Sequence, residues 1–131
     1  MPILGAIIVP HPPLIIPTVG RGQERQVQAT IDAYRAAAKQ AADWMPEVLV
    51  ISSPHTIMYA DYFHISPGAG AAGSMASFGA SQTQLEVKYD TELRQELVRQ
   101  AEAAGLRAGT LGERDPALDH GTFLPLYFCK S

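Results

Sequence analysis

The sequence predicts an α/β fold, with helices on both sides of a mainly parallel or mixed sheet in a three-layer α/β/α arrangement. Two continuous apolar runs, at residues 3–9 and 48–51, are typical of strands buried on both faces. A helical pattern lies between them, and strand, helix and strand within ~50 residues predict a right-handed βαβ unit. A chain of 131 residues is expected to form one domain, residues 1–131.

The helix between the two apolar runs is expected from about residue 23 to residue 45. Its apolar stripe, at spacings of three and four, consists of Val27, Ile31, Tyr34, Ala38, Ala41 and Met45. A second helix is expected from about residue 91 to residue 104, with Asp90 as its N-cap and Gly105 after its end. Further strands are expected at residues 62–66, 85–89, 108–111 and 123–129. The glycine-rich stretch 67–80 is predicted to be a long flexible loop.

Composition excludes several classes of protein. The net charge of −3 gives no electrostatic reason to expect binding to nucleic acid or to an anionic membrane. No apolar run approaches the ~20 residues that span a bilayer, and the start of the chain does not resemble a signal peptide. Cys129 is the single cysteine, which excludes an intrachain disulfide and a thiolate-rich metal site. A cytoplasmic location is expected.

Two histidines follow the two predicted parallel strands in matching contexts. His11 lies in Val9-Pro10-His11-Pro12, and His55 lies in Ser53-Pro54-His55-Thr56. Proline stiffens each exit, and parallel strands end at the same sheet edge, which is where α/β proteins bind ligands. Either histidine alone is more simply explained as a strand cap. The matched pair favours one shared site.

His120 is the third candidate, in Leu118-Asp119-His120-Gly121-Thr122, where the glycine allows a backbone to approach a ligand closely. A neutral imidazole there could act as a general acid or base, or donate to a substrate oxygen; the alternative is an ordinary polar loop. His64 lies inside a predicted strand and is interpreted as a structural histidine; the alternative is that it lines the pocket. Two imidazoles suit Fe(II) or Zn(II) and do not distinguish between them.

These motifs together resemble the class III extradiol ring-cleavage dioxygenases, the family of catalytic B subunits, and most closely the branch associated with Memo-like proteins. The residues that carry the resemblance are Ile8-Val9-Pro10-His11-Pro12-Pro13, Ser53-Pro54-His55 and Leu118-Asp119-His120-Gly121-Thr122. It covers essentially the whole chain, and three separated motifs in the right order are fairly specific for the superfamily. They do not identify the substrate.

The resemblance implies a fold, a metal centre and a reaction. The fold would be a shortened version of the B-subunit fold. His11 and His55 would be ligands of Fe(II), and His120 would contact a substrate oxygen or dioxygen. The substrates would be a small catecholic aromatic compound and O₂. Family members are about twice this length, and their third ligand, a glutamate, lies in the second half. We therefore expect this chain to be an N-terminal portion that lacks the third ligand.

Two other functions remain open at this point. The same cleft would serve a non-catalytic, Memo-like module that binds a small molecule or a peptide. The same two histidines would also serve a zinc-dependent hydrolase or lyase, which would work without O₂.

A homo-oligomer is also expected. Residues 124–128 are predicted to form an apolar strand where the family's sheet would continue, and an unpaired apolar edge is a template for pairing with a second copy. The alternative is a monomer in which these residues fold back over their own sheet.

Overall fold

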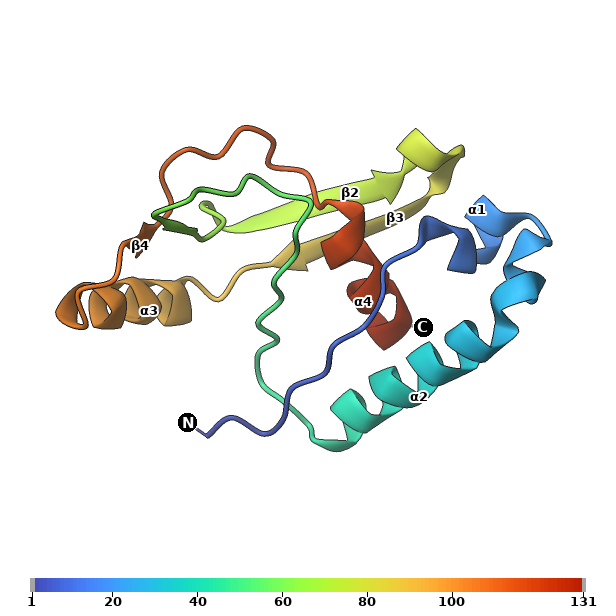
Figure 1. Ribbon diagram of the computed structural model, residues 1–131, viewed down its shortest axis with the longest axis horizontal. Coiled ribbons are helices and arrows are strands. Elements are labelled where there is room, and N and C mark those ends of the chain that lie inside the picture. Colours follow the sequence, from blue (N-terminus) through green and yellow to red (C-terminus); the bar gives the residue numbers. More distant parts are fainter. Residues whose placement is uncertain (1, 131) are drawn as a thin grey trace.

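The computed structural model describes residues 2–130 and consists of helices and short strands joined by long loops (Figure 1). The α-helices are α1 (Pro17–Gly20), α2 (Gln28–Asp43), α3 (Thr91–Ala103) and α4 (His120–Lys130). The strands are β1 (Phe63–His64), β2 (Gly70–Met75), β3 (Ala80–Lys88) and β4 (Ala108–Gly109). Short 3₁₀ helices are η1 (Pro13–Ile15), η2 (Gln23–Val27) and η3 (Ala76–Phe78). In residues 2–130, no helix is both long enough and apolar enough to cross a bilayer.

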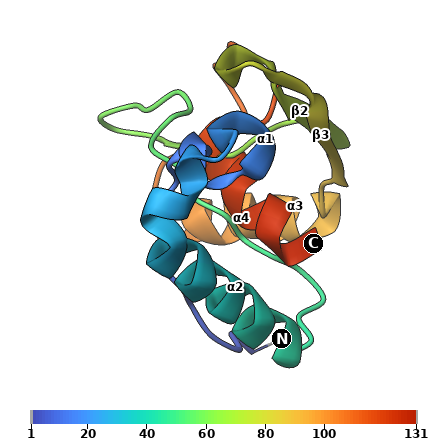
Figure 2. The same cartoon turned by 90° about the vertical axis from the view of Figure 1, so that its right-hand side faces the viewer.

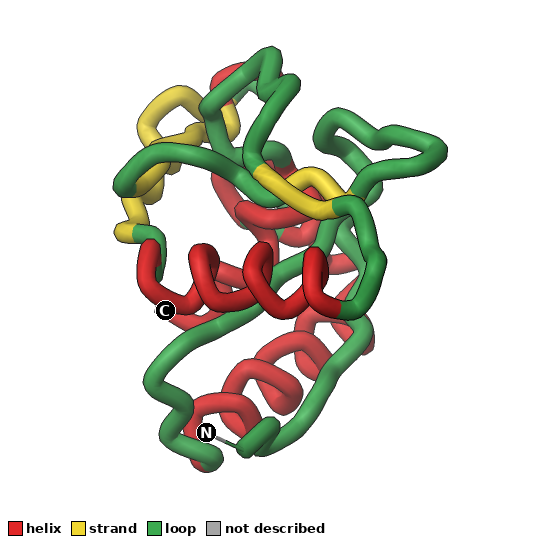
Figure 3. Tube along the Cα trace, turned by 90° about the vertical axis from the view of Figure 1, so that its left-hand side faces the viewer, coloured by secondary structure: helices red, strands yellow, loops and turns green. Residues whose placement is uncertain are grey.

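The strands form two pairs of opposite kinds. β1 and β4 pair in parallel, with Phe63 opposite Ala108, and this pair lies next to α3 (Figure 3). β2 and β3 form an antiparallel hairpin whose register shifts between Ser74 and Met75, beside η3. The α/β class expected from the sequence is confirmed, with strand directions that are mixed.

Residues 3–9 and 48–51 do not form the parallel strands that their apolar runs predict. Both segments are extended, but no backbone hydrogen bond joins them within the described part of the chain. They still run in the same direction, because Gly5 packs on the Trp44 ring near their starts and His11 meets His55 after their ends. Apolar side chains on both segments are open to solvent, with Ile8 fully exposed and Val50 77% exposed. The prediction was wrong about pairing and right about direction.

The C-terminal apolar run is a helix rather than the expected strand. Short apolar runs do not distinguish a buried strand from a buried helix, and here helical spacing places Leu124 and Phe128 one turn apart on the buried side of α4. Asp119 also accepts hydrogen bonds from Thr122 at the start of this helix, which favours helix formation there.

The glycine-rich stretch predicted as a loop contains strand β2. Small residues let β2 lie very close to its neighbours: a Cβ at Gly70 would lie 2.4 Å from the carbonyl oxygen of Val87. A Cβ at Gly73 would lie 2.7 Å from the Leu118 Cβ. Glycine here therefore permits close packing of the backbone, and the predicted flexible loop was wrong for residues 70–75.

The two predicted helices are present within a few residues of their expected bounds. The first is divided into η2 and α2, and the chain leaves it at Met45, whose φ is 50°. In α3, the Asp90 side chain accepts a hydrogen bond of 2.9 Å from the Leu93 amide, so Asp90 is the N-cap as expected.

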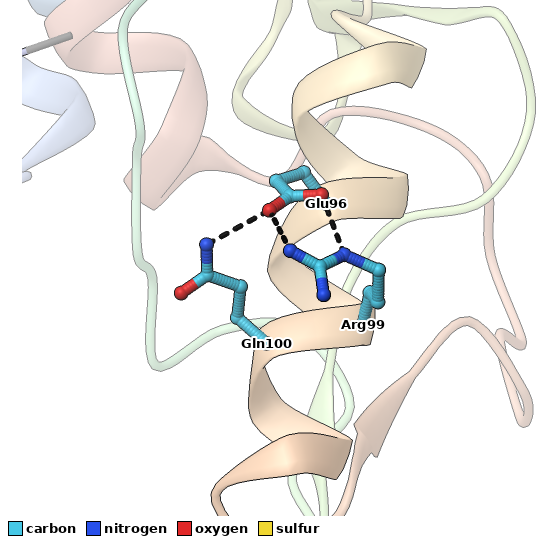
Figure 4. Close-up of polar contacts among 3 residues, drawn as sticks. All are labelled: Glu96, Arg99 and Gln100. Carbon is cyan, nitrogen blue, oxygen red and sulfur yellow. Dashed lines mark hydrogen bonds and ion pairs between the residues drawn. The ribbon is translucent and has the colours of Figure 1, made fainter.

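The exposed face of α3 carries a small polar cluster (Figure 4). Arg99 and Gln100 both donate hydrogen bonds to the Glu96 carboxylate, and these bonds lower the pKa of Glu96 to about 2. The cluster lies on the solvent-exposed side of α3 and supports the helix locally.

The buried core joins α4 to α2 and to the hairpin, with α4 in the middle of the view in Figure 2. Its members are Ile15, Ile16, Ile31, Tyr34, Met75, Ala80, Phe123, Leu124 and Phe128. Since α4 buries its apolar side chains within its own chain, residues 124–128 do not form the unpaired edge from which a homo-oligomer was predicted. The oligomer stays a prediction without that argument.

Tyr34 provides a test of the core. Its ring is 4% exposed and stacks on Phe128 at 4.5 Å, but within residues 2–130 its hydroxyl has no hydrogen-bond partner. Burial accordingly raises the pKa of Tyr34. A buried hydroxyl without a partner costs about 1–3 kcal/mol. We therefore expect Tyr34→Phe to raise the free energy of unfolding by about 1 kcal/mol in urea denaturation, and a loss of stability would contradict this packing.

Candidate metal centre

Three histidines from distant parts of the sequence meet in one cluster. His11 lies just before η1, His55 follows the extended segment 48–51, and His120 is the first residue of α4. The Nδ1 atom of His11 lies 3.2 Å from the Nε2 atom of His55. One ring nitrogen from each of the three residues lies within 4.8 Å of the other two. All three site residues expected from the sequence are therefore brought together.

Proline residues restrict the backbone that positions His11 and His55 in the cluster. Pro10 and Pro12 flank His11, and Pro54 precedes His55, so the φ angles of these prolines are fixed. The ring centroids of His55 and His120 are 4.0 Å apart, and those of His11 and His55 are 4.5 Å apart. The side of the cluster that carries His55 is exposed to solvent, while the other two histidines are half-buried.

The dimensions of the cluster fit one metal ion. Zinc lies about 2.0–2.1 Å from an imidazole nitrogen, so two nitrogens on the same ion are at most about 4.2 Å apart. The 3.2 Å separation between His11 and His55 meets this limit directly. The third imidazole requires at most a small side-chain rotation, because its nitrogen lies within 4.8 Å of the others. The donor set is entirely imidazole, which suits Fe(II) and Zn(II).

The surroundings of His120 favour the neutral imidazole, which is the protonation state that a metal ligand or a general base requires. Burial lowers the pKa of His120, the neighbouring His55 and His11 lower it further, and Asp119 partly opposes them. The imidazole is therefore neutral at pH 7, with a ring nitrogen available to accept a proton or to bind a metal.

Asp119 anchors the start of α4 beside the cluster. Its carboxylate accepts hydrogen bonds from the Thr122 hydroxyl at 2.7 Å, from the Thr122 amide at 3.3 Å, and from the Ser53 hydroxyl. Burial raises the pKa of Asp119, but these hydrogen bonds outweigh burial and hold the pKa below its usual value. Asp119 is therefore ionised at neutral pH and joins the His55 segment to the helix that carries His120.

An aromatic side chain also reaches the cluster from the hairpin. Phe78 in η3 lies edge-on to His120, with ring centroids 5.4 Å apart, and is 40% exposed. The hairpin tip is fixed by Arg21, whose Nη2 atom donates a 2.9 Å hydrogen bond to the Gly79 carbonyl oxygen. Phe78 was not predicted as a site residue, because no local motif in the sequence indicates it.

His64 and Asp61 lie outside the cluster. His64 is in β1, and its Nδ1 atom is 3.1 Å from the Leu111 carbonyl oxygen, as expected for a structural histidine. Asp61 forms an exposed ion pair with Arg107. In the described part of the chain, no carboxylate joins the three histidines in a group of potential metal ligands.

Comparison with known proteins identifies the family. Residues 5–131 match the model for the catalytic LigB subunit of aromatic ring-opening dioxygenase, and the chain belongs to this family. Dioxygenases of this family are generally metal-dependent. The chain is also 31% identical over 144 aligned positions to Protein CA_C1420 of Clostridium acetobutylicum. That alignment covers 98% of this chain and 29% of the relative, so the chain spans less than a third of the relative's length. No solved structure matches this chain.

Proposed function

We propose that the chain provides the histidine part of the active centre of a non-haem Fe(II) extradiol dioxygenase, which opens catecholic aromatic rings with O₂. The observation that carries the proposal is the convergence of His11, His55 and His120 in a member of a family of aromatic ring-opening dioxygenases. Neither the metal nor the substrate follows from the family match alone, so both belong to the proposal.

In this proposal the three histidines have different roles. His11 and His55 hold the metal through the ring nitrogens that face each other. A bound Fe(II) would supply charge stabilisation for the substrate oxygens and the redox chemistry with O₂. A neutral ring nitrogen of His120 accepts the proton of a catechol hydroxyl, and the same group returns a proton later in the reaction.

The proposal requires a further metal ligand from outside residues 2–130. The family resemblance implies a glutamate, and the described cluster contains only imidazoles. The relative is more than three times the length of the segment that matches, so it has ample sequence to supply such a residue.

A ring-cleavage assay tests the proposed function. The protein, together with the part that supplies the further metal ligand, is loaded anaerobically with Fe(II), mixed with several catechols, and exposed to O₂ while the yellow ring-fission product is followed by absorbance. A full-length member of the family serves as the positive control. Oxygen-dependent product supports the proposal, and no product from any catechol while the control is active would overturn it.

Phe78 is expected to form an apolar wall for the aromatic substrate, because it is partly exposed and contacts His120. Aromatic pairs contribute about 0.5–1.5 kcal/mol. We therefore expect Phe78→Ala to weaken catechol binding by about twofold to tenfold in isothermal titration of the metal-loaded protein. Phe63→Ala is the matched control, because Phe63 is an exposed phenylalanine of β1 with no contact to the cluster among the ring contacts described. Equal affinities for both variants would exclude this role.

A zinc-dependent hydrolase or lyase is the second candidate, favoured by the all-imidazole cluster. Three histidines with an open position for water are a known zinc-binding arrangement, and zinc chemistry does not consume O₂. Activity of the zinc-loaded protein under argon would distinguish this candidate from the dioxygenase.

The cytoplasmic location and the homo-oligomer stay predictions.

A further inference from the structure

Ser53 connects two of the three histidine segments through its hydroxyl group. The Oγ atom donates a hydrogen bond to Oδ2 of Asp119, a residue 66 positions further along the chain. The same Oγ atom accepts a hydrogen bond of 3.2 Å from the backbone amide of His55. A single hydroxyl therefore contacts both the turn that carries His55 and the residue that precedes His120.

The Asp119 end of this connection is fixed independently of Ser53. Thr122 donates to Asp119 from its hydroxyl and from its amide, and both bonds lie within the first turn of α4. Both bonds come from a residue of the same helix, so they hold the carboxylate against the backbone of α4. Asp119 is thus a rigid acceptor whose position is set by the helix.

Gly121 provides a second, independent observation. A Cβ atom at this position would lie 2.3 Å from the Ser53 Oγ atom and 3.0 Å from Oδ2 of Asp119. The residue is helical, so it needs no unusual backbone conformation, and the absence of a side chain is what lets the Ser53 segment touch α4. A larger residue would separate the two histidine segments.

We infer that Ser53 is a positioning residue that fixes the His55 imidazole against the His120 imidazole before any metal binds. The connection from Asp119 through Ser53 to the His55 amide sets the 4.0 Å separation of the two rings. The His55 turn is exposed, and without this connection its side chain would sample positions away from the cluster. This inference deepens the proposed function, and the metal-binding part of its test rests on that proposal.

The first test uses the metal-free protein. Ring protons of His55 and His120 should give nuclear Overhauser cross-peaks in the wild type, because their ring centroids are 4.0 Å apart. We expect Ser53→Ala to abolish these cross-peaks while leaving the circular dichroism spectrum unchanged. Ser52→Ala is the matched control, since the neighbouring Ser52 is exposed and is not part of this connection. Cross-peaks of wild-type intensity in folded Ser53→Ala would overturn the inference.

Gly121→Ala gives an independent perturbation, because it leaves both the hydroxyl and the carboxylate in place and separates them by steric overlap. The same loss of cross-peaks is expected. If either variant is unfolded, the other still decides the outcome. If both folded variants keep the cross-peaks between His55 and His120, the two rings are held together by other contacts and the inference is wrong.

The second test measures Co(II) affinity and the visible absorption spectrum of the bound ion. Residues that orient metal ligands typically contribute 10-fold to 100-fold in affinity, so we expect Ser53→Ala and Asp119→Ala each to weaken Co(II) binding by about that factor. The double variant should lose little more than either single variant, because both remove the same connection. Additive losses of affinity would contradict a shared role.

If the wild type binds Co(II) but cleaves no catechol, the dioxygenase proposal fails while this inference stands. If it binds no metal, the cross-peaks alone decide.

Discussion

His11→Ala is expected to abolish stoichiometric binding of a divalent metal. The variant removes one of the two imidazoles whose nitrogens lie 3.2 Å apart, and the remaining described residues offer no carboxylate to replace it. Losing a residue that only orients a ligand costs 10-fold to 100-fold in affinity, so losing the ligand itself should cost more than about 100-fold. The dissociation constants of Fe(II) and Zn(II), measured anaerobically by isothermal titration, check this result.

His64→Ala is the control for this experiment, because it removes an imidazole that contacts the Leu111 carbonyl oxygen rather than the cluster. It should bind metal as the wild type does. His120→Ala should also keep the metal, since its proposed role is proton transfer, and should impair turnover. Wild-type metal affinity in His11→Ala would show that the site has been assigned to the wrong residues.

Phe123→Ala is expected to destabilise the protein more than any other single change discussed for the core. Phe123 is completely buried in the first turns of α4 and is the largest of the side chains that are fully inaccessible to solvent. Replacing a buried phenylalanine by alanine costs about 3–5 kcal/mol, a large part of the 5–15 kcal/mol that stabilises a typical domain. Urea denaturation followed by circular dichroism measures the change in midpoint.

Phe63→Ala is the matched control for this loss. Phe63 is 67% exposed, so its removal should change the free energy of unfolding by no more than about 0.5 kcal/mol. Equal denaturation midpoints for the two variants would contradict the assignment of Phe123, and with it the buried side of α4, to the core.

The convergence of the histidines could be predicted because it depends on local features. Proline fixes the backbone beside His11 and His55, and the helix between their segments reverses the chain so that both segments run in the same direction. The two helices could be predicted because their apolar spacing and the Asp90 cap are also local.

Strand pairing could not be predicted with the same success. A run that is apolar on both faces indicates burial, but pairing also requires a neighbouring strand, and residues 3–9 have none within the described chain. The C-terminal run is also apolar on both faces, but it forms a helix. As a helix it buries Phe123 and Leu124 against α2 and the hairpin.

The roles of Ser53 and Phe78 could not be predicted from the sequence for a different reason. Their roles depend on contacts with Asp119 and His120, which are distant in sequence and become neighbours only in the folded chain. The sequence contained Ser53 within a motif, but the direction of its hydroxyl depends on the position of α4.

The most direct test of the metal centre is an anomalous-difference map from a crystal grown or soaked anaerobically with Fe(II). We predict one peak per chain, about 2.0–2.2 Å from one ring nitrogen each of His11 and His55 and next to His120. A peak that does not touch His11 and His55, or an empty cluster in a crystal that binds iron elsewhere, would contradict the account.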